Sequence, residues 1–183
     1  RAYRKRGLSR HFRKALRQQQ KHLEKNTLRH PEHHLHRHRL EMEEFLMQSR
    51  SGRTRALNLE EVNRQMDLGW ISLKLRQACL TLSHQTVFST EYKLPLIPEL
   101  LRLGAQPDFL QHPAVALYYY CYQALTAAAP EPYFLQLKDR LFHYADAFPQ
   151  PEMRDLLLLA INYCIKRINA NEHRYLEEAL ALY

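Results

Sequence analysis

The apolar residues of this chain recur with the spacing of α-helices. The clearest stretch is 153–168, in which apolar side chains occupy most of the circumference of a helix. The remaining polar positions fall on one narrow stripe, formed by Asp155, Asn162, Lys166 and Asn169. A helix with so little polar surface needs neighbours on two sides, so we expect it to be sandwiched between other helices.

The same periodicity along the rest of the chain predicts further helices, several of them opened by a cap residue or a proline. The predicted helices cover 9–25, 31–48, 58–85, 91–103, 113–129, 132–148, 151–168 and a last segment from near 172. Short connections make neighbouring helices antiparallel. We therefore expect four hairpins, over 9–48, 58–104, 113–148 and 151–183.

Two glycines and one uncharged run add detail to this picture. Gly69, inside the third helix, indicates either a kink or the close approach of a neighbouring helix, and we favour the close approach. Gly104 is expected to close the fourth helix. Residues 112–129 carry no charged side chain, but the stretch is short for a membrane span and contains four tyrosines. We predict a buried core helix there.

Composition agrees with an all-helical protein. Only four glycines occur in 183 residues, which is few for a sheet with many tight turns or for a Gly-rich phosphate loop. The cysteines, Cys79, Cys121 and Cys164, lie in apolar helical runs without the paired spacing of a zinc site. We expect three reduced, buried thiols and a cytoplasmic protein.

Charge divides the chain into two parts. Residues 1–56 contain sixteen Lys and Arg against five Asp and Glu, a difference of +11, whereas residues 57–183 contain eleven against fourteen, a difference of −3. We predict a basic N-terminal helical hairpin over 1–56 and a helical-repeat core over 57–183. The chain begins without methionine and shows no helix-stop signal or signal peptide, so we expect a piece of a longer protein.

Several sequence segments resemble the helical-repeat region of long, uncharacterised bacterial proteins with tetratricopeptide-like solenoids. They are Lys74 to Cys79, Glu91-Tyr92, Ala114 to Tyr119 and Asp155 to Ile165. The resemblance implies a repeat fold and brings no activity, ligand or catalytic residue with it. Together with the 38-residue offset between Pro113 and Pro151, it predicts an all-α stack of antiparallel hairpins, an α-solenoid with degenerate repeats.

The basic first segment has three interpretations. Its cations could follow the phosphates of a nucleic acid, with Tyr3 and Phe12 stacking on bases; they could meet an acidic partner protein; or they could form a solvated face. An anionic membrane surface fits less well because the apolar stripe of this helix is thin. The cations are Arg4, Lys5, Arg6, Arg10, Arg13, Lys14 and Arg17.

Tyrosines are the second group of candidate contact residues. Tyr118, Tyr119, Tyr120 and Tyr122 could line the concave side of a solenoid, where an aromatic ring with a polar tip makes a good contact. Four neighbouring tyrosines cannot all face one groove. At least half of them should therefore lie in the core, with their hydroxyls bonded to helix ends or water.

The sequence contains few signs of a metal-binding or catalytic site. His34 and His38, with His30, could form a metal pair at helical spacing, but a solvated basic helix explains these histidines more simply, and we assign no metal or cofactor. Nucleotide-loop, zinc-protease and nucleophile-elbow motifs do not occur. An enzyme would need a deep pocket lined by residues such as His84, His112, Asp139 or His143. The sequence thus favours a non-catalytic protein–protein interaction scaffold, with nucleic-acid binding through the basic helices as the alternative.

Overall fold

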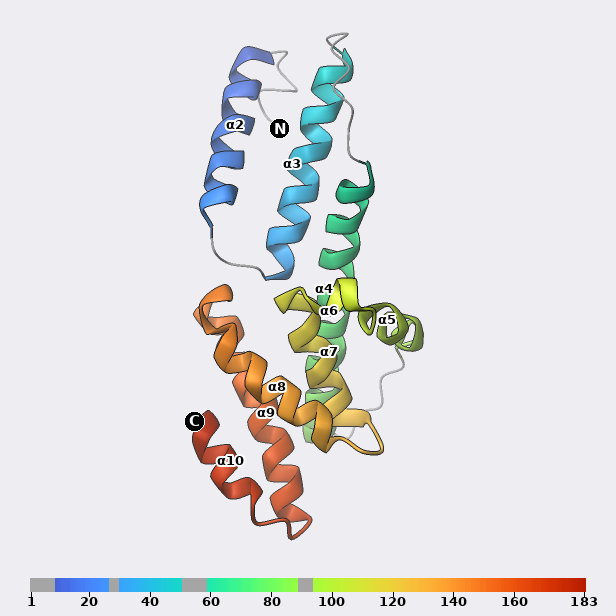
Figure 1. The fold of residues 1–183 in the computed structure, drawn as a ribbon, viewed down its shortest axis with the longest axis vertical. Helices are drawn as coiled ribbons and strands as arrows, with labels where there is room; N and C mark the ends of the chain where they lie inside the picture. Colours follow the sequence, from blue (N-terminus) through green and yellow to red (C-terminus); the bar gives the residue numbers. More distant parts are fainter. Residues whose placement is uncertain (1–8, 27–29, 51–58, 89–93) are drawn as a thin grey trace.

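The computed structural model describes residues 9–26, 30–50, 59–88 and 94–183. In these ranges the regular structure is helical and no strand is formed, which confirms the all-α prediction. At one end of the molecule α2, α3 and the start of α4 lie side by side; toward the other end α7 lies along α4, with α8, α9 and α10 beyond it (Figure 1). None of the helices in the described ranges combines the length and the apolar character that crossing a membrane requires.

Helices α2 (Ser9–Lys25) and α3 (Pro31–Arg50) form the first hairpin, at the predicted positions. Proline suits the first turn of α3 because its missing N–H has no partner there in any helix. Helix α2 packs chiefly on α3. The predicted boundary between residues 56 and 57 lies outside the described residues.

Helix α4 (Leu59–Phe88) has 30 residues, so it is about 45 Å long. It packs against both α3 and α7. A Cβ atom added to Gly69 would lie 2.6 Å from two side-chain carbons of Leu35 on α3. The glycine therefore permits the close approach of the neighbouring helix, as predicted, and α4 continues through it without interruption.

Two short helices follow, α5 (Ile97–Gly104) and α6 (Pro107–Leu110). The prediction of a helix from residue 91 was wrong at its start, because α5 begins only at Ile97, after Pro95 and with Pro98 in its first turn. Residues 91–93 lie outside the described ranges. Gly104 is the last residue of α5, and a Cβ there would lie 3.3 Å from the ring of Tyr119. Because Gly104 has no side chain, α5 can pack closely against α7 at this position.

The C-terminal part consists of α7 (Pro113–Thr126), α8 (Glu131–His143), the 3-10 turn η1 (Ala145–Ala147), α9 (Gln150–Asn169) and α10 (Tyr175–Leu182). Here α7 pairs with α8, and α9 pairs with α10. The predicted helix over 132–148 was too long, since α8 ends at His143. Asn171, in the turn before α10, has a positive φ of 65°, a conformation that asparagine tolerates better than most residues.

Helix α7 is the most deeply buried helix of the fold. Its residues from Ala114 to Tyr119 are all buried, and it contacts α4, α8 and α9. The uncharged run is therefore a core helix, as predicted. Helix α9 was expected to be sandwiched between neighbours, and it packs against α10, α7 and α8. Leu158 and Ile165 on its outer face are 50% and 46% exposed. One side of α9 thus remains open.

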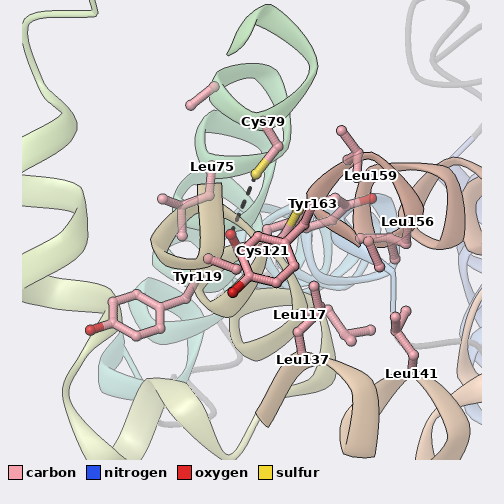
Figure 2. Close-up of a cluster of buried hydrophobic side chains, with 14 of the residues drawn as sticks. Leu75, Cys79, Leu117, Tyr119, Cys121, Leu137, Leu141, Leu156, Leu159 and Tyr163 are labelled. Carbon is pink, nitrogen blue, oxygen red and sulfur yellow. Dashed lines mark hydrogen bonds between the residues drawn. The ribbon is translucent and has the colours of Figure 1, made fainter. Parts of the chain in front are cut away.

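The main core lies where α4, α7, α8 and α9 meet (Figure 2). The Cys79 thiol on α4 donates a hydrogen bond to the backbone oxygen of Tyr118, at 3.5 Å. Cys79, Cys121 and Cys164 are all free and buried, which confirms the prediction for the three thiols. Burial raises the pKa of Cys79, and it raises that of Cys164 to about 11.

Candidate functional site

Helix α2 presents a continuous positive surface to solvent. Its six cations are all exposed, and the helix carries a single carboxylate, Glu24. At roughly 100° per residue, five of them fall within a sector of about 80° on the side opposite to Phe12, Leu16 and Leu23. The six are Arg10, Arg13, Lys14, Arg17, Lys21 and Lys25.

These cations are not neutralised by the part of the chain that the structure describes, where no salt bridge joins any of them to a carboxylate. Other helices differ. Arg37 on α3 pairs with Glu41 at 3.1 Å, and Lys138 on α8 pairs with Glu178 at 2.5 Å. Of the predicted contact residues in this segment, Arg10, Arg13, Lys14 and Arg17 lie on the positive surface. Arg6, together with Tyr3, Arg4 and Lys5, lies outside the described residues.

A groove runs along one side of the seam between α2 and α3. It encloses about 410 Å³, and we call it the α2–α3 groove. Its apolar lining comes from Phe12, Leu16 and Leu23 on α2 and Leu40 on α3. The polar lining adds Arg39, two histidines and a single carboxylate, and its members are Gln19, His22, Asn26, His36, Arg39 and Glu43.

A smaller cavity of about 260 Å³ lies along the same seam, and we call it the acidic cavity. It shares Leu16, Leu23 and Leu40 with the α2–α3 groove. Three of its lining residues are glutamates, and the full polar set is Gln20, Glu24, His33, Arg37, Glu41 and Glu44. The seam between α2 and α3 is thus accessible from two sides, of which one has balanced charge and the other is acidic.

The aromatic ring predicted to stack on bases is not available for that role. Phe12 is only 7% exposed, because it belongs to the apolar face that joins α2 to α3. Within 9–26, α2 carries no other Phe, Tyr or Trp. Base stacking through Phe12 is therefore a wrong prediction, whereas the predicted stacking of Tyr3 lies outside the described residues.

The tyrosines divide as the sequence predicted, with at least half of them in the core. Tyr118 and Tyr119 are 1% and 8% exposed, so they cannot serve as surface contacts, and Tyr122 is half-buried. The Tyr118 hydroxyl donates to the buried carboxylate of Glu152 at the start of α9, and Arg76 lies 3.8 Å from that carboxylate. Burial and the facing carboxylate raise the pKa of Tyr118.

The histidines of α3 join it to α4. His34 is hydrogen-bonded through Nδ1 to Gln65 at 2.8 Å, and His38 through Nδ1 to the backbone oxygen of Val62 at 2.9 Å. Over the described parts of the chain, no three His, Cys, Asp or Glu side chains come together as a metal site. These contacts give the two histidines a structural role.

A polar network at the junction of α3, α4 and α7 was missed by sequence reasoning. Arg64 donates two hydrogen bonds to Glu61 and approaches Nε2 of His112 at 2.8 Å, while Gln65 connects Glu61 to His34. Partial burial, with His34 and Arg64 nearby, lowers the pKa of His112 to about 4. Burial alone would raise the pKa of Glu61, but hydrogen bonds from Gln65 and Arg64 hold it below its usual value.

Comparison with models of protein families, with curated proteins and with solved structures finds no match for this chain. The site is therefore assigned from the arrangement of its own residues.

The four residues that were named as the lining of a possible enzyme pocket do not lie together in the structure. His84 lines a shallow groove of about 650 Å³ on α4 that contains none of the other three. Asp139 and His143 are exposed on α8, and His112 belongs to the network before α7. The positive surface of α2 is the strongest candidate for a functional site, because it combines charge that the described residues do not neutralise with accessible surface.

Proposed function

We propose that this protein is a non-catalytic protein–protein interaction scaffold of stacked helical hairpins, and that its α2–α3 hairpin binds an acidic partner protein. The observation that carries the proposal is the row of exposed cations on α2, unneutralised by the described residues; a groove with an apolar lining runs along the other side of the same helix. Apolar surface supplies binding free energy, and charge complementarity supplies orientation and rapid association.

A solenoid of degenerate, tetratricopeptide-like hairpins is the architecture we propose for the longer assembly of helices. The pairing of α7 with α8 and of α9 with α10 supports it, as does the open outer face of α9. The three free cysteines fit the reducing cytoplasm, which is the compartment we propose.

Nucleic-acid binding is the second candidate, and the positive surface of α2 favours it. Cations spaced along one helix face can neutralise successive phosphates. Two features favour a protein partner instead: the described part of α2 exposes no Phe, Tyr or Trp for base stacking, and an apolar groove runs along the same hairpin.

Affinity capture with nuclease treatment tests the proposal. The chain and a variant with Arg13, Lys14 and Arg17 changed to glutamine are immobilised and exposed to nuclease-treated cell extract. A control variant carries glutamine at Lys74, Arg154 and Lys166, three exposed cations outside α2. We expect the unaltered chain and the control to retain the same proteins, and the α2 variant to lose them. The proposal would be overturned if the unaltered chain retains no protein, or retains proteins only from extract that has not been treated with nuclease.

A further inference from the structure

Helices α2 and α3 form a unit that is attached to the rest of the molecule along one helix. They pack on each other, and α3 packs extensively on α4. Figure 1 shows the pair at one end of the molecule, with α9 and α10 toward the other end. Among the described residues, the pair has no comparably large contact with any helix after α4. Such a unit opens without unfolding of the C-terminal core once the contacts along α3 are released.

A chain of hydrogen bonds crosses this attachment and ends at His112, the residue before α7. It begins on α3, where Nδ1 of His34 donates to the amide oxygen of Gln65 at 2.8 Å. The Gln65 amide donates to Oε1 of Glu61 at 2.8 Å, and Arg64 donates to Oε2 of Glu61. Arg64 also lies 2.8 Å from Nε2 of His112. The chain thus joins the first hairpin to α4 and to the start of the C-terminal core.

The direction of the last bond fixes the protonation state of His112. A guanidinium group has only N–H donors, so Nε2 of His112 must accept the bond from Arg64 through its lone pair. A proton on that nitrogen would place two N–H groups, and two positive charges, against each other at 2.8 Å. The intact chain of hydrogen bonds therefore requires a neutral His112.

His34 covers one side of the same imidazole. The two rings meet edge to face with their centroids 5.8 Å apart, and His34 is 3% exposed. Burial, then His34 and then Arg64 lower the pKa of His112 to about 4, while Glu61 acts in the opposite direction. Departure of α3 removes His34 and admits water to the ring, so the opened form binds a proton on His112 more tightly than the closed form does.

The groups around His112 do little to compensate a proton on its ring. Glu61 is the carboxylate that favours such a proton, and it already accepts hydrogen bonds from Gln65 and Arg64. Helix α7, which follows His112, carries no charged side chain. The other charged or titratable groups on the neighbouring helices are His33, His34 and Arg37 on α3, Arg64 on α4 and the exposed Asp108 on α6.

We propose that neutral His112 is a latch for the first hairpin: a proton on its ring breaks the bond from Arg64 and releases α3 from α4, while α7, α8 and α9 stay packed. The positive surface of α2 moves with the released unit. This inference goes beyond the proposed function, because it concerns how the hairpin is held and applies whatever partner α2 binds.

Val62→Cys supplies a thiol that reports the opening of this unit. Val62 lies on α4 and is 3% exposed, and its backbone oxygen accepts a hydrogen bond from His38 of α3 at 2.9 Å. Cys121 on α7 and Cys164 on α9 report the opening of the core in the same molecule. The reaction of each thiol with a dipyridyl disulfide is followed by mass spectrometry at pH 7 and pH 5, relative to the rate of glutathione at the same pH. Amide exchange of α3 in the unaltered chain, corrected for intrinsic rates, gives the same comparison without a substitution.

The introduced thiol should react about tenfold faster than Cys121 and Cys164 at both pH values, because only the hairpin must open to expose it. Low concentrations of urea should accelerate the two core thiols more strongly, since unfolding of the core exposes more surface. From pH 7 to pH 5 the relative rate of the introduced thiol should rise about tenfold, as the opened form gains a proton on His112. Equal rates and equal urea dependence for the three thiols would show that the chain opens only as a whole, which overturns the inference.

His112→Gln tests the latch itself. Glutamine keeps an oxygen that accepts from Arg64 but does not titrate, so the pH dependence of the introduced thiol should fall to less than about threefold. His36→Gln is the matched control, because His36 is exposed on α3, and it should leave the dependence on pH unchanged. If the dependence persists in His112→Gln, or disappears equally in His36→Gln, His112 is not the latch and the inference is wrong.

Discussion

Tyr118 of α7 donates its hydroxyl hydrogen to the carboxylate of Glu152 in α9, and the two side chains are 1% and 7% exposed. Arg76 on α4 approaches the same carboxylate. One buried acidic group thus connects three helices. A charged group in such a place is stable only while its partners remain, because water cannot replace them.

Removing this hydroxyl should destabilise the fold. Tyr118→Phe leaves the Glu152 carboxylate without its buried donor, so we expect the free energy of unfolding to fall by about 1–3 kcal/mol. Urea denaturation followed by circular dichroism measures it. Tyr119→Phe is the control, because the Tyr119 hydroxyl only accepts a long bond of 3.3 Å from Gln123, and it should cost less than about 0.5 kcal/mol. Equal costs would show that the Glu152 contact contributes nothing specific.

Gly69→Ala should also destabilise the protein, although alanine is the better helix former by about 1 kcal/mol. The new methyl group would lie 2.6 Å from Cγ and Cδ2 of Leu35 and 3.3 Å from its backbone nitrogen, so α3 itself must move. Overpacking of this kind costs about 1–3 kcal/mol. We expect a net loss of about 1–2 kcal/mol in thermal or urea unfolding.

A double-mutant cycle isolates the contact between Gly69 and Leu35. Shortening the partner with Leu35→Ala removes the obstructing atoms, so the combined variant should be more stable than the sum of the two single effects predicts. Simple additivity in this cycle would contradict the close approach of α3 and α4 at Gly69.

Acid should weaken the junction of α3, α4 and α7. The folded state lowers the pKa of His112 to about 4, so between pH 6.5 and pH 4 the unfolded chain binds more protons than the folded one. The free energy of unfolding therefore decreases as the pH falls through this window. We expect His112 to account for about 1–2 kcal/mol of that decrease, since one pKa unit corresponds to about 1.4 kcal/mol and the ring is partly solvated.

Urea midpoints measured at intervals from pH 7 to pH 4.5 test this dependence. His112→Gln removes the titrating group, so its stability should vary less with pH than that of the unaltered chain. Measurements above pH 4.5 limit the contribution of Glu61, which loses its own stabilising effect at lower pH because its folded pKa is depressed. Parallel pH profiles for the two proteins would contradict the assignment to His112.

Thiol reactivity should report unfolding. Cys79, Cys121 and Cys164 are at most 1% exposed, and burial raises the pKa values of Cys79 and Cys164, so little thiolate is present at neutral pH. We expect all three to react with a disulfide reagent such as dithionitrobenzoate only at the rate at which the core opens. Rapid stoichiometric reaction in the absence of denaturant would be inconsistent with the core of α4, α7 and α9.

Local sequence signals placed most of the helices correctly. Pro31 and Pro113 mark the true starts of α3 and α7, because proline costs nothing in a first helical turn. The same signals failed at α5, whose start is set by two prolines in close succession, and at the end of α8, where no glycine or proline marks the stop at His143.

Burial and the candidate site were harder to predict, because they depend on which helices meet. The side chains of Phe12 and Tyr118 looked equally suited to surface contact or to a core, and only tertiary packing decides between these roles. The network of Arg64 with His112 joins residues far apart in the chain, so no local sequence pattern predicts it. The cations of α2, in contrast, were evident from sequence because charge density is a local property.

The length of α4 has a consequence for how the two ends of the molecule depend on each other. Its backbone hydrogen bonds continue from Leu59 to Phe88, so the first hairpin and the C-terminal core are attached to one continuous rod. A chain cut at residue 57 would keep that rod but remove the α3 residues that contact Val62 and Gly69. The first hairpin therefore also shields α4 from solvent. When either the first hairpin or the C-terminal core is disturbed, the rate of amide hydrogen exchange should change in the same direction at both ends of α4.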